Sequence, residues 1–120
     1  MNDLRTTLVQ CDLRWEDPDA NCKLLEQQLG DLDGGTTDLI VLPEMFSTGF
    51  TMNSREMAEP MAESPAVAWL LDQARQRNCV VTGSVAVVEA GEYVNRLIWA
   101  RPDGSLVHYD KRHLFRMAGE

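Results

Sequence analysis

The chain has 120 residues, of which 44% are hydrophobic and 25% are charged, and its formal net charge is −8. This balance is typical of a single soluble globular domain, which we place over residues 1–120. The negative charge argues against binding to nucleic acid or to anionic membrane surfaces, because both attract cationic proteins. No apolar run is long enough for a membrane span, and the N-terminus lacks the pattern of a secretory signal, so we expect a cytoplasmic protein.

The three cysteines, Cys11, Cys22 and Cys79, form no CxxC pair. An odd number of cysteines without that spacing argues against a disulfide framework or a zinc site. We therefore expect each cysteine to behave as a small buried hydrophobic side chain.

The first third of the chain predicts two strands and one helix. The range 4–10 contains β-branched residues and favours a strand. Asp17, followed by proline, is a typical helix N-cap, and the apolar spacing behind it predicts a helix to about Leu32, which a pair of glycines then ends. The apolar run 38–43 predicts a second strand that is covered on both faces, as in a parallel sheet.

The middle of the chain predicts a loop, a helix and a strand. The range 44–63 has no regular pattern and indicates a long loop with one helical turn. Ser64, followed by proline, caps a helix whose apolar residues run at helical spacing from Val67 to Ala74, with Arg75 and Arg77 where the helix dipole favours cations. The range 79–88 predicts a strand, in which Gly83 indicates a bulge or a close backbone approach.

The end of the chain predicts a hairpin over 93–109. Two strand-like segments, 93–100 and 106–109, flank a turn with proline at its second position. Alternating strands and helices followed by a hairpin predict an α/β layered fold with a mixed sheet.

Two charged residues are candidates for chemistry because each follows a predicted strand. Glu44 comes after a strand of the buried type, at the sheet edge where open α/β sheets gather their ligands. Lys111 follows the last strand, where a lysine can stabilise an oxyanion or hold a base in place. The alternative for both is an ordinary solvated surface charge. His113 fits a packing role better than a catalytic one, and no motif for a nucleophile is present.

The segments around these two residues resemble the motifs of a known enzyme family. The segment around Glu44 reads LPEMFSTGF, and the segment around Lys111 reads YDKRHLF. They are similar, in order and spacing, to the glutamate and lysine motifs of the nitrilase superfamily of carbon–nitrogen hydrolases. The first strand and the segment VVTGSVAV resemble the same family, so the resemblance covers essentially the whole chain. Within the superfamily, the motifs look most similar to those of bacterial omega-amidases.

The resemblance implies an α-β-β-α sandwich that pairs into homodimers or higher homo-oligomers, a small-molecule amide substrate and no cofactor. In the family's mechanism a cysteine thiolate attacks a nonpeptide C–N bond, a glutamate is the general base and a lysine stabilises the oxyanion. By position, Glu44 matches the base and Lys111 the lysine, while Glu120 is the candidate for a second glutamate that positions substrate or water. Omega-amidases hydrolyse the distal amide of 2-oxoglutaramate or 2-oxosuccinamate to the oxo acid and ammonia.

The nucleophilic cysteine is the feature of the family that this chain does not match. In the family it follows the lysine by a few dozen residues, and none of Cys11, Cys22 and Cys79 lies in its motif. We therefore expect the chain to be the N-terminal part of a longer enzyme, inactive by itself and with apolar surface left uncovered. The alternatives are another amidase, carbamoylase or nitrilase of the superfamily, or a noncatalytic α/β binding or scaffold domain.

Overall fold

The computed structural model describes residues 3–112 of the chain. Among these residues, six strands form one sheet in the order β1-β2-β4-β5-β6, and β3 pairs with β4 beside this path. The strands are β1 (Thr6–Leu8), β2 (Leu39–Val41), β3 (Glu59–Pro60), β4 (Val80–Glu89), β5 (Glu92–Ala100) and β6 (Leu106–Asp110). The helices are α1 (Pro18–Leu29), α2 (Ser54–Met57) and α3 (Pro65–Arg77), with a 3₁₀ turn at Met61–Glu63.

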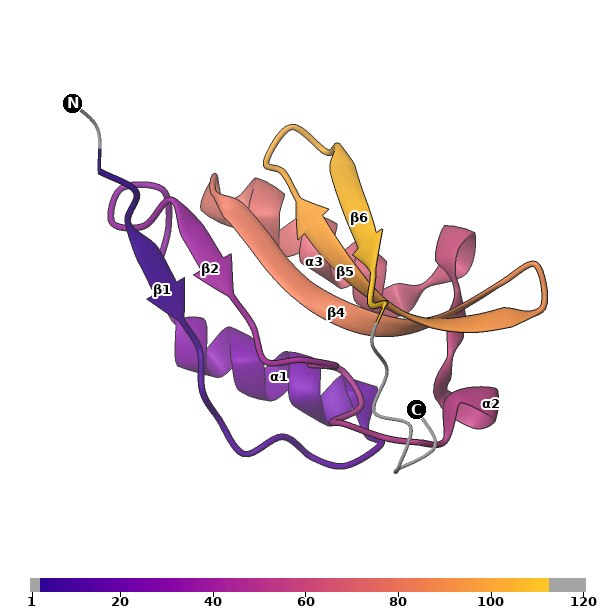
Figure 1. Ribbon diagram of the computed structural model, residues 1–120. Coiled ribbons are helices and arrows are strands. Elements are labelled where there is room, and N and C mark those ends of the chain that lie inside the picture. Colours follow the sequence, from indigo (N-terminus) through magenta and orange to yellow (C-terminus); the bar gives the residue numbers. More distant parts are fainter. Residues whose placement is uncertain (1–2, 113–120) are drawn as a thin grey trace.

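The sheet is mixed, as the sequence predicts (Figure 1). β1, β2 and β4 run parallel to one another, and β3 runs parallel to β4. β4, β5 and β6 are antiparallel neighbours, so the hairpin expected over 93–109 is confirmed. Parallel strands joined by α1 and α3 and followed by an antiparallel meander make this an α/β fold.

Helices α1 and α3 pack side by side on one face of the sheet. The Trp69 indole of α3 donates a hydrogen bond of 2.8 Å to the Glu26 carboxylate of α1. The apolar side chains beneath the two helices form one core with alternate residues of the strands, as the period of two requires. The fully buried members of this core are Leu25, Ile40, Phe46, Leu70, Ala74, Val81, Val87, Ile98 and Ala100.

The start and end of the helices follow from local capping. Asp17 accepts a hydrogen bond from the Ala20 amide, which caps α1 as expected. The Ser64 side chain likewise accepts a hydrogen bond from a backbone amide in the first turn of α3 and caps that helix. The prediction that the first helix reaches Leu32 is wrong, because α1 ends at Leu29. Gly30 takes the C-cap position with a φ of 54°, a left-handed value that glycine adopts readily.

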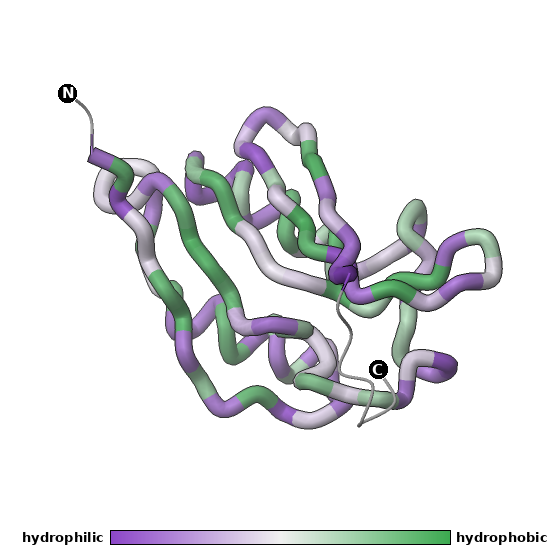
Figure 2. Tube along the Cα trace, viewed as in Figure 1, coloured by the Kyte–Doolittle hydropathy of each residue, from purple (hydrophilic) through white to green (hydrophobic). Residues whose placement is uncertain are grey.

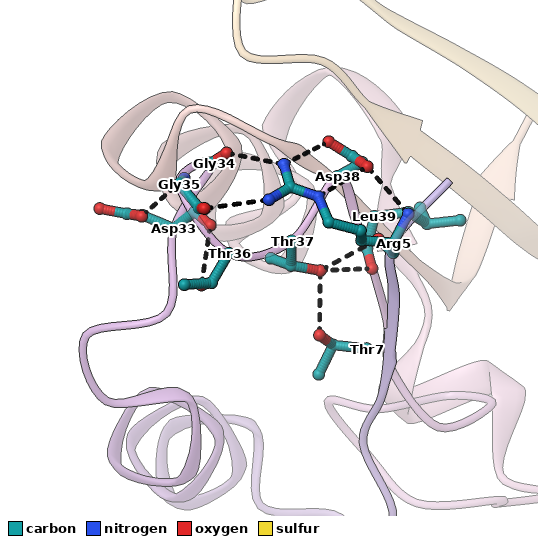
Figure 3. Close-up of polar contacts among 9 residues, drawn as sticks. All are labelled: Arg5, Thr7, Asp33, Gly34, Gly35, Thr36, Thr37, Asp38 and Leu39. Atoms are coloured by element: carbon teal, nitrogen blue, oxygen red, sulfur yellow. Dashed lines mark hydrogen bonds and ion pairs between the residues drawn. The ribbon is translucent and has the colours of Figure 1, made fainter. Parts of the chain in front are cut away.

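The two glycines expected to end that helix belong instead to the turn before β2. The guanidinium of Arg5 pairs with Asp38 and donates hydrogen bonds to the carbonyls of Gly34 and Gly35 (Figure 3). Hydrogen bonds from Arg5 hold the pKa of the Asp38 carboxyl at about 2. These contacts fix the start of β1 against the start of β2. β1 contains only Thr6–Leu8 of the strand expected over 4–10.

The range 44–63 is more structured than a loop with one helical turn. It contains α2, which is that turn, but also the strand β3 and the 3₁₀ turn at Met61–Glu63. β3 joins the sheet through the parallel pairing of Glu59 with Val87 and of Pro60 with Val88. The loop is therefore attached to β4 at its far end.

The face of the sheet turned away from α1 and α3, which we call the open face, carries exposed apolar side chains. Leu97, Val107 and Tyr109 on β5 and β6 are 41%, 48% and 53% exposed, and no helix of the described residues covers them. This confirms the expectation of uncovered apolar surface. Most of β2 is hydrophobic as well (Figure 2), as expected for a strand that is covered on both faces. Within residues 3–112, no helix combines the length and apolar character that crossing a bilayer requires.

Candidate active site

Glu44 stands on a tight turn that follows β2. The next residue, Met45, has a φ of 51°, a left-handed value that costs a residue with a side chain about 1 kcal/mol or more. The turn is held by two contacts that offset this cost. The Met45 amide donates a buried hydrogen bond of 2.8 Å to the Ser84 hydroxyl of β4, and Phe46 packs in the core with its ring centroid 5.4 Å from that of Trp69. These two contacts hold the backbone that carries Glu44 in this conformation.

Lys111 lies beside Glu44 although the two are far apart in the chain. The Lys111 Nζ atom is 3.2 Å from Glu44 Oε2, and it also lies over the Phe50 ring, 5.2 Å from the centroid. The sequence placed each of these residues at the end of a predicted strand, and the structure brings the two side chains together, as a shared site at the strand ends requires. In the described part of the chain their side chains are 47% and 32% exposed, so the ion pair contributes little to stability by itself.

Asn95 of β5 completes the cluster and was not singled out in the sequence. Its side-chain amide donates a hydrogen bond of 2.9 Å to Glu44 Oε2, and its backbone carbonyl accepts one of 2.9 Å from the Lys111 amide. The signal that could have found it is the hairpin register, because the turn after Ala100 places Asn95 opposite Lys111. Its side chain alone carries no catalytic signature.

These residues surround a pocket on the open face of the sheet. The pocket has a volume of about 320 Å³ and combines apolar walls with the polar cluster of Glu44, Asn95 and Lys111. A carboxylate beside an ammonium group provides a proton acceptor and a cation for a developing oxyanion within one small cavity. The other lining residues are Val41, Leu42, Thr82, Gly83, Ser84, Leu97 and Tyr109.

None of the three cysteines of the chain lines this pocket. Cys79 is buried and Cys11 and Cys22 are half-buried, so the expectation of small buried side chains is confirmed fully only for Cys79. Burial raises the pKa of the Cys22 thiol to about 11, and it also raises the pKa of the Cys11 and Cys79 thiols. Such thiols are poor sources of thiolate near neutral pH. Glu120 and His113 lie outside the described residues, so the role expected of Glu120 stays a prediction.

Comparison with known proteins points to one family. The sequence profile described as "Carbon-nitrogen hydrolase" matches residues 5–120. The omega-amidase YafV of Yersinia enterocolitica is 43% identical over 120 residues, which cover 100% of this chain and 45% of that protein. The 2-oxoglutaramate amidase of Bacillus subtilis is 31% identical over 115 residues, which cover 93% of this chain and 44% of that protein.

A solved structure agrees with these relatives. XC1258 of Xanthomonas campestris, a CN-hydrolase superfamily protein, superposes with a TM-score of 0.93 at 45% identity. The match covers 100% of this chain and 44% of the XC1258 chain. The chain thus spans less than half the length of the relatives that it matches.

Proposed function

The chain belongs to the carbon–nitrogen hydrolase family, and we propose that its full-length protein is an omega-amidase. The substrate is the distal amide of a short 2-oxo acid, such as 2-oxoglutaramate or 2-oxosuccinamate, and the products are the oxo acid and ammonia. The observation that carries the proposal is the convergence of Glu44 and Lys111, 3.2 Å apart, on one pocket. The substrate class is supported by the omega-amidase and the 2-oxoglutaramate amidase among the relatives.

In the proposed mechanism, the nucleophile is a cysteine that lies outside these 120 residues. Glu44 takes the proton of its thiol, and the thiolate attacks the amide carbon. The carbonyl oxygen becomes an oxyanion, which the ammonium group of Lys111 stabilises. Glu44 then returns the proton to the amide nitrogen, so that the C–N bond breaks, ammonia leaves and a thioester remains.

The second half of the cycle uses the same two residues. Glu44 takes a proton from a water molecule, which attacks the thioester carbon, and Lys111 again faces the oxyanion. Collapse of this intermediate releases the oxo acid and restores the thiol with the proton held by Glu44. Glu120 is proposed as the second glutamate that positions substrate or water.

The open face fits a protein with a second layer. The side chains of Leu97, Val107 and Tyr109 form an apolar surface that is about half exposed to solvent. In the proposed α-β-β-α sandwich, a second sheet packs over this face and closes the pocket that Glu44 and Lys111 line. Desolvation by that layer strengthens every charge interaction in the site. We also propose that the full-length protein forms dimers, as members of the family do, and that it is located in the cytoplasm.

The test is ammonia release by the purified full-length protein from 2-oxoglutaramate, an N-carbamoyl amino acid and an aliphatic nitrile. Preference for the oxo-acid amide, measured as kcat/KM, is the expected result. Preference for the carbamoyl compound or the nitrile would assign the protein to another branch of the family. A folded protein that turns over none of the three compounds would favour a noncatalytic domain.

A further inference from the structure

Asn95 contacts both members of the proposed catalytic pair. Its side chain donates to Glu44 Oε2 at 2.9 Å, and its carbonyl accepts from the Lys111 amide at 2.9 Å. We propose that Asn95 is a positioning residue, which orients the Glu44 carboxylate so that one particular oxygen of the two accepts the proton of the thiol or of water. This inference rests on the proposed function and adds Asn95 to the residues of its site.

The sheet fixes where the Asn95 side chain lies. β5 and β6 pair in antiparallel register as far as Arg96 and Asp110, and the hydrogen bond from the Lys111 amide to Asn95 extends the ladder by one residue. Side chains of opposed residues on antiparallel strands stand on the same face of the sheet. Asn95 and Lys111 therefore reach Glu44 from neighbouring positions on the open face, and Asn95 does so as a buried residue that is only 6% exposed.

The chemistry of the two groups fixes the orientation of the amide. An ionised carboxylate only accepts hydrogen bonds, so the nitrogen of the Asn95 amide must face Glu44. Glu44 Oε2 then receives both Asn95 Nδ2 at 2.9 Å and Lys111 Nζ at 3.2 Å. Glu44 Oε1 accepts no hydrogen bond from any residue of the described range 3–112. Oε1 is therefore the oxygen left to accept the proton of the thiol or of water.

Asn95 supplies rigidity that Lys111 does not. The Lys111 ammonium ends a chain of four flexible carbons, whereas the asparagine amide is short and held in a buried strand. Glu44 is 47% exposed, so without a fixed donor its carboxylate would rotate among several orientations. A misplacement of a catalytic group by about 1 Å can cost about 10²-fold in rate. Removal of the Asn95 donor is therefore expected to act on kcat.

The test uses the full-length protein with two substitutions at Asn95 and one matched control. Asn95→Leu removes the amide, and Asn95→Asp keeps the shape of the side chain but replaces the donor by a carboxylate. Gln73→Leu deletes another buried amide, on α3 across the sheet, which bonds Glu26 and Arg77 and takes no part in the site. The rates to measure are kcat and KM for ammonia release from 2-oxoglutaramate, with the thermal midpoint of each variant.

Both Asn95 variants are expected to lower kcat by about 10- to 100-fold with KM changed less than about threefold, because orientation of the base matters in the transition state. The control is expected to keep the wild-type kcat even where its thermal midpoint falls. A wild-type kcat in Asn95→Asp would overturn the inference, because a side chain of the same shape would then support catalysis without the hydrogen-bond donor. If Asn95→Leu does not fold, Asn95→Asp alone decides the test. A wild-type protein that releases no ammonia would overturn the proposed function itself, and Asn95 would lose its role with it.

Discussion

Gly83 of β4 lies directly against the ring of Phe46, the second residue after Glu44. A Cβ atom on Gly83 would stand 2.8 Å from Cδ1 and 3.2 Å from Cε1 of that ring. The ring is fully buried, so it has little room to withdraw. The close backbone approach expected at Gly83 is thus confirmed. The pairing of β4 with β5 runs through Gly83 without interruption, so the alternative of a bulge is wrong.

Gly83→Ala is expected to lower the free energy of unfolding by about 1–3 kcal/mol, because the added methyl group overpacks the core. It also pushes on the turn that carries Glu44, so kcat should fall as well. Urea unfolding of the full-length protein measures the first effect. In the double variant Gly83→Ala/Phe46→Leu, the smaller side chain relieves the contact and recovers part of the loss. Strict additivity of the two single changes would contradict this account.

Glu44→Gln is expected to lower kcat on 2-oxoglutaramate by about 10²- to 10⁴-fold, because a glutamine side chain cannot accept the proton. The fold should be retained, since glutamine has the same shape and Glu44 is half exposed. Glu63→Gln, at an exposed glutamate of the 3₁₀ turn, is the matched control and should leave kcat unchanged. Near-normal turnover in Glu44→Gln would remove the general-base assignment.

Lys111→Met is expected to lower kcat and kcat/KM together by about 10²- to 10³-fold, because in the proposed mechanism the ammonium group stabilises an oxyanion that the bound substrate does not carry. Lys111→Arg should not restore the rate, since a planar guanidinium does not replace a compact ammonium group at the same distance from Glu44. Steady-state kinetics with 2-oxoglutaramate give both constants. A variant that raises only KM would instead place Lys111 in substrate binding.

Acid should weaken the fold through a buried arginine on β5. The Arg96 side chain, 4% exposed, donates to Asp110 at 2.7 Å and to Glu89 at 3.1 Å, and these hydrogen bonds lower the pKa of both carboxyls. A carboxyl whose pKa is lower in the folded state stabilises the protein above its unfolded pKa of about 4, and this stabilisation is lost as the pH falls through the folded pKa.

Asp110→Asn is therefore expected to lower the free energy of unfolding at neutral pH by about 1 kcal/mol, a figure that solvent screening of the partly exposed carboxylate keeps small. The same variant should lose less further stability than the wild type as the pH falls below about 4. Asp31→Asn, at an exposed residue, is the control and should follow the wild-type curve. Parallel curves for Asp110→Asn and the wild type would show that Arg96 does not create this pH dependence. Urea unfolding at several pH values makes the comparison.

The sequence predicted those parts of the site that local patterns determine. Glu44 and Lys111 could be placed at strand ends because apolar runs and a proline turn mark the strands. Asn95 was not singled out, because an asparagine within a strand carries no signal by itself, and the register of the hairpin is needed to identify its partner. Its role depends on a contact between positions 51 residues apart.

The fold shows the same division between local and long-range causes. The capped helix α3 was predicted at both ends, since Ser64 and the apolar spacing are local signals. The two-residue strand β3 could not be predicted, because its pairing with β4 is a long-range contact. Local signals also do not distinguish Gly30 from Gly34 as the end of α1. The contact of Arg5 with the Gly34 carbonyl holds that glycine in the turn before β2.

The positions of the cysteines lead to a last prediction, that the 120-residue chain alone releases no ammonia from 2-oxoglutaramate. The proposed reaction needs a thiolate within hydrogen-bond reach of Glu44, and none of the three cysteines lines the pocket. Their thiols also have raised pKa values, that of Cys22 about 11. Glu44 and Lys111 can orient a water molecule, but without the cysteine no acyl-enzyme forms.

The experiment compares the specific activity of the purified chain with that of the full-length protein under the same conditions. Circular dichroism of the chain establishes that its fold is intact, so that inactivity reflects the missing nucleophile and not unfolding. Comparable activity would falsify the assignment of the nucleophile to a cysteine outside the chain. Alanine substitution at Cys11, Cys22 and Cys79 in turn would then identify the thiol, because only the reacting cysteine abolishes turnover when it is removed. If all three alanine variants kept their activity, the result would point to direct attack by water, with Glu44 as its base.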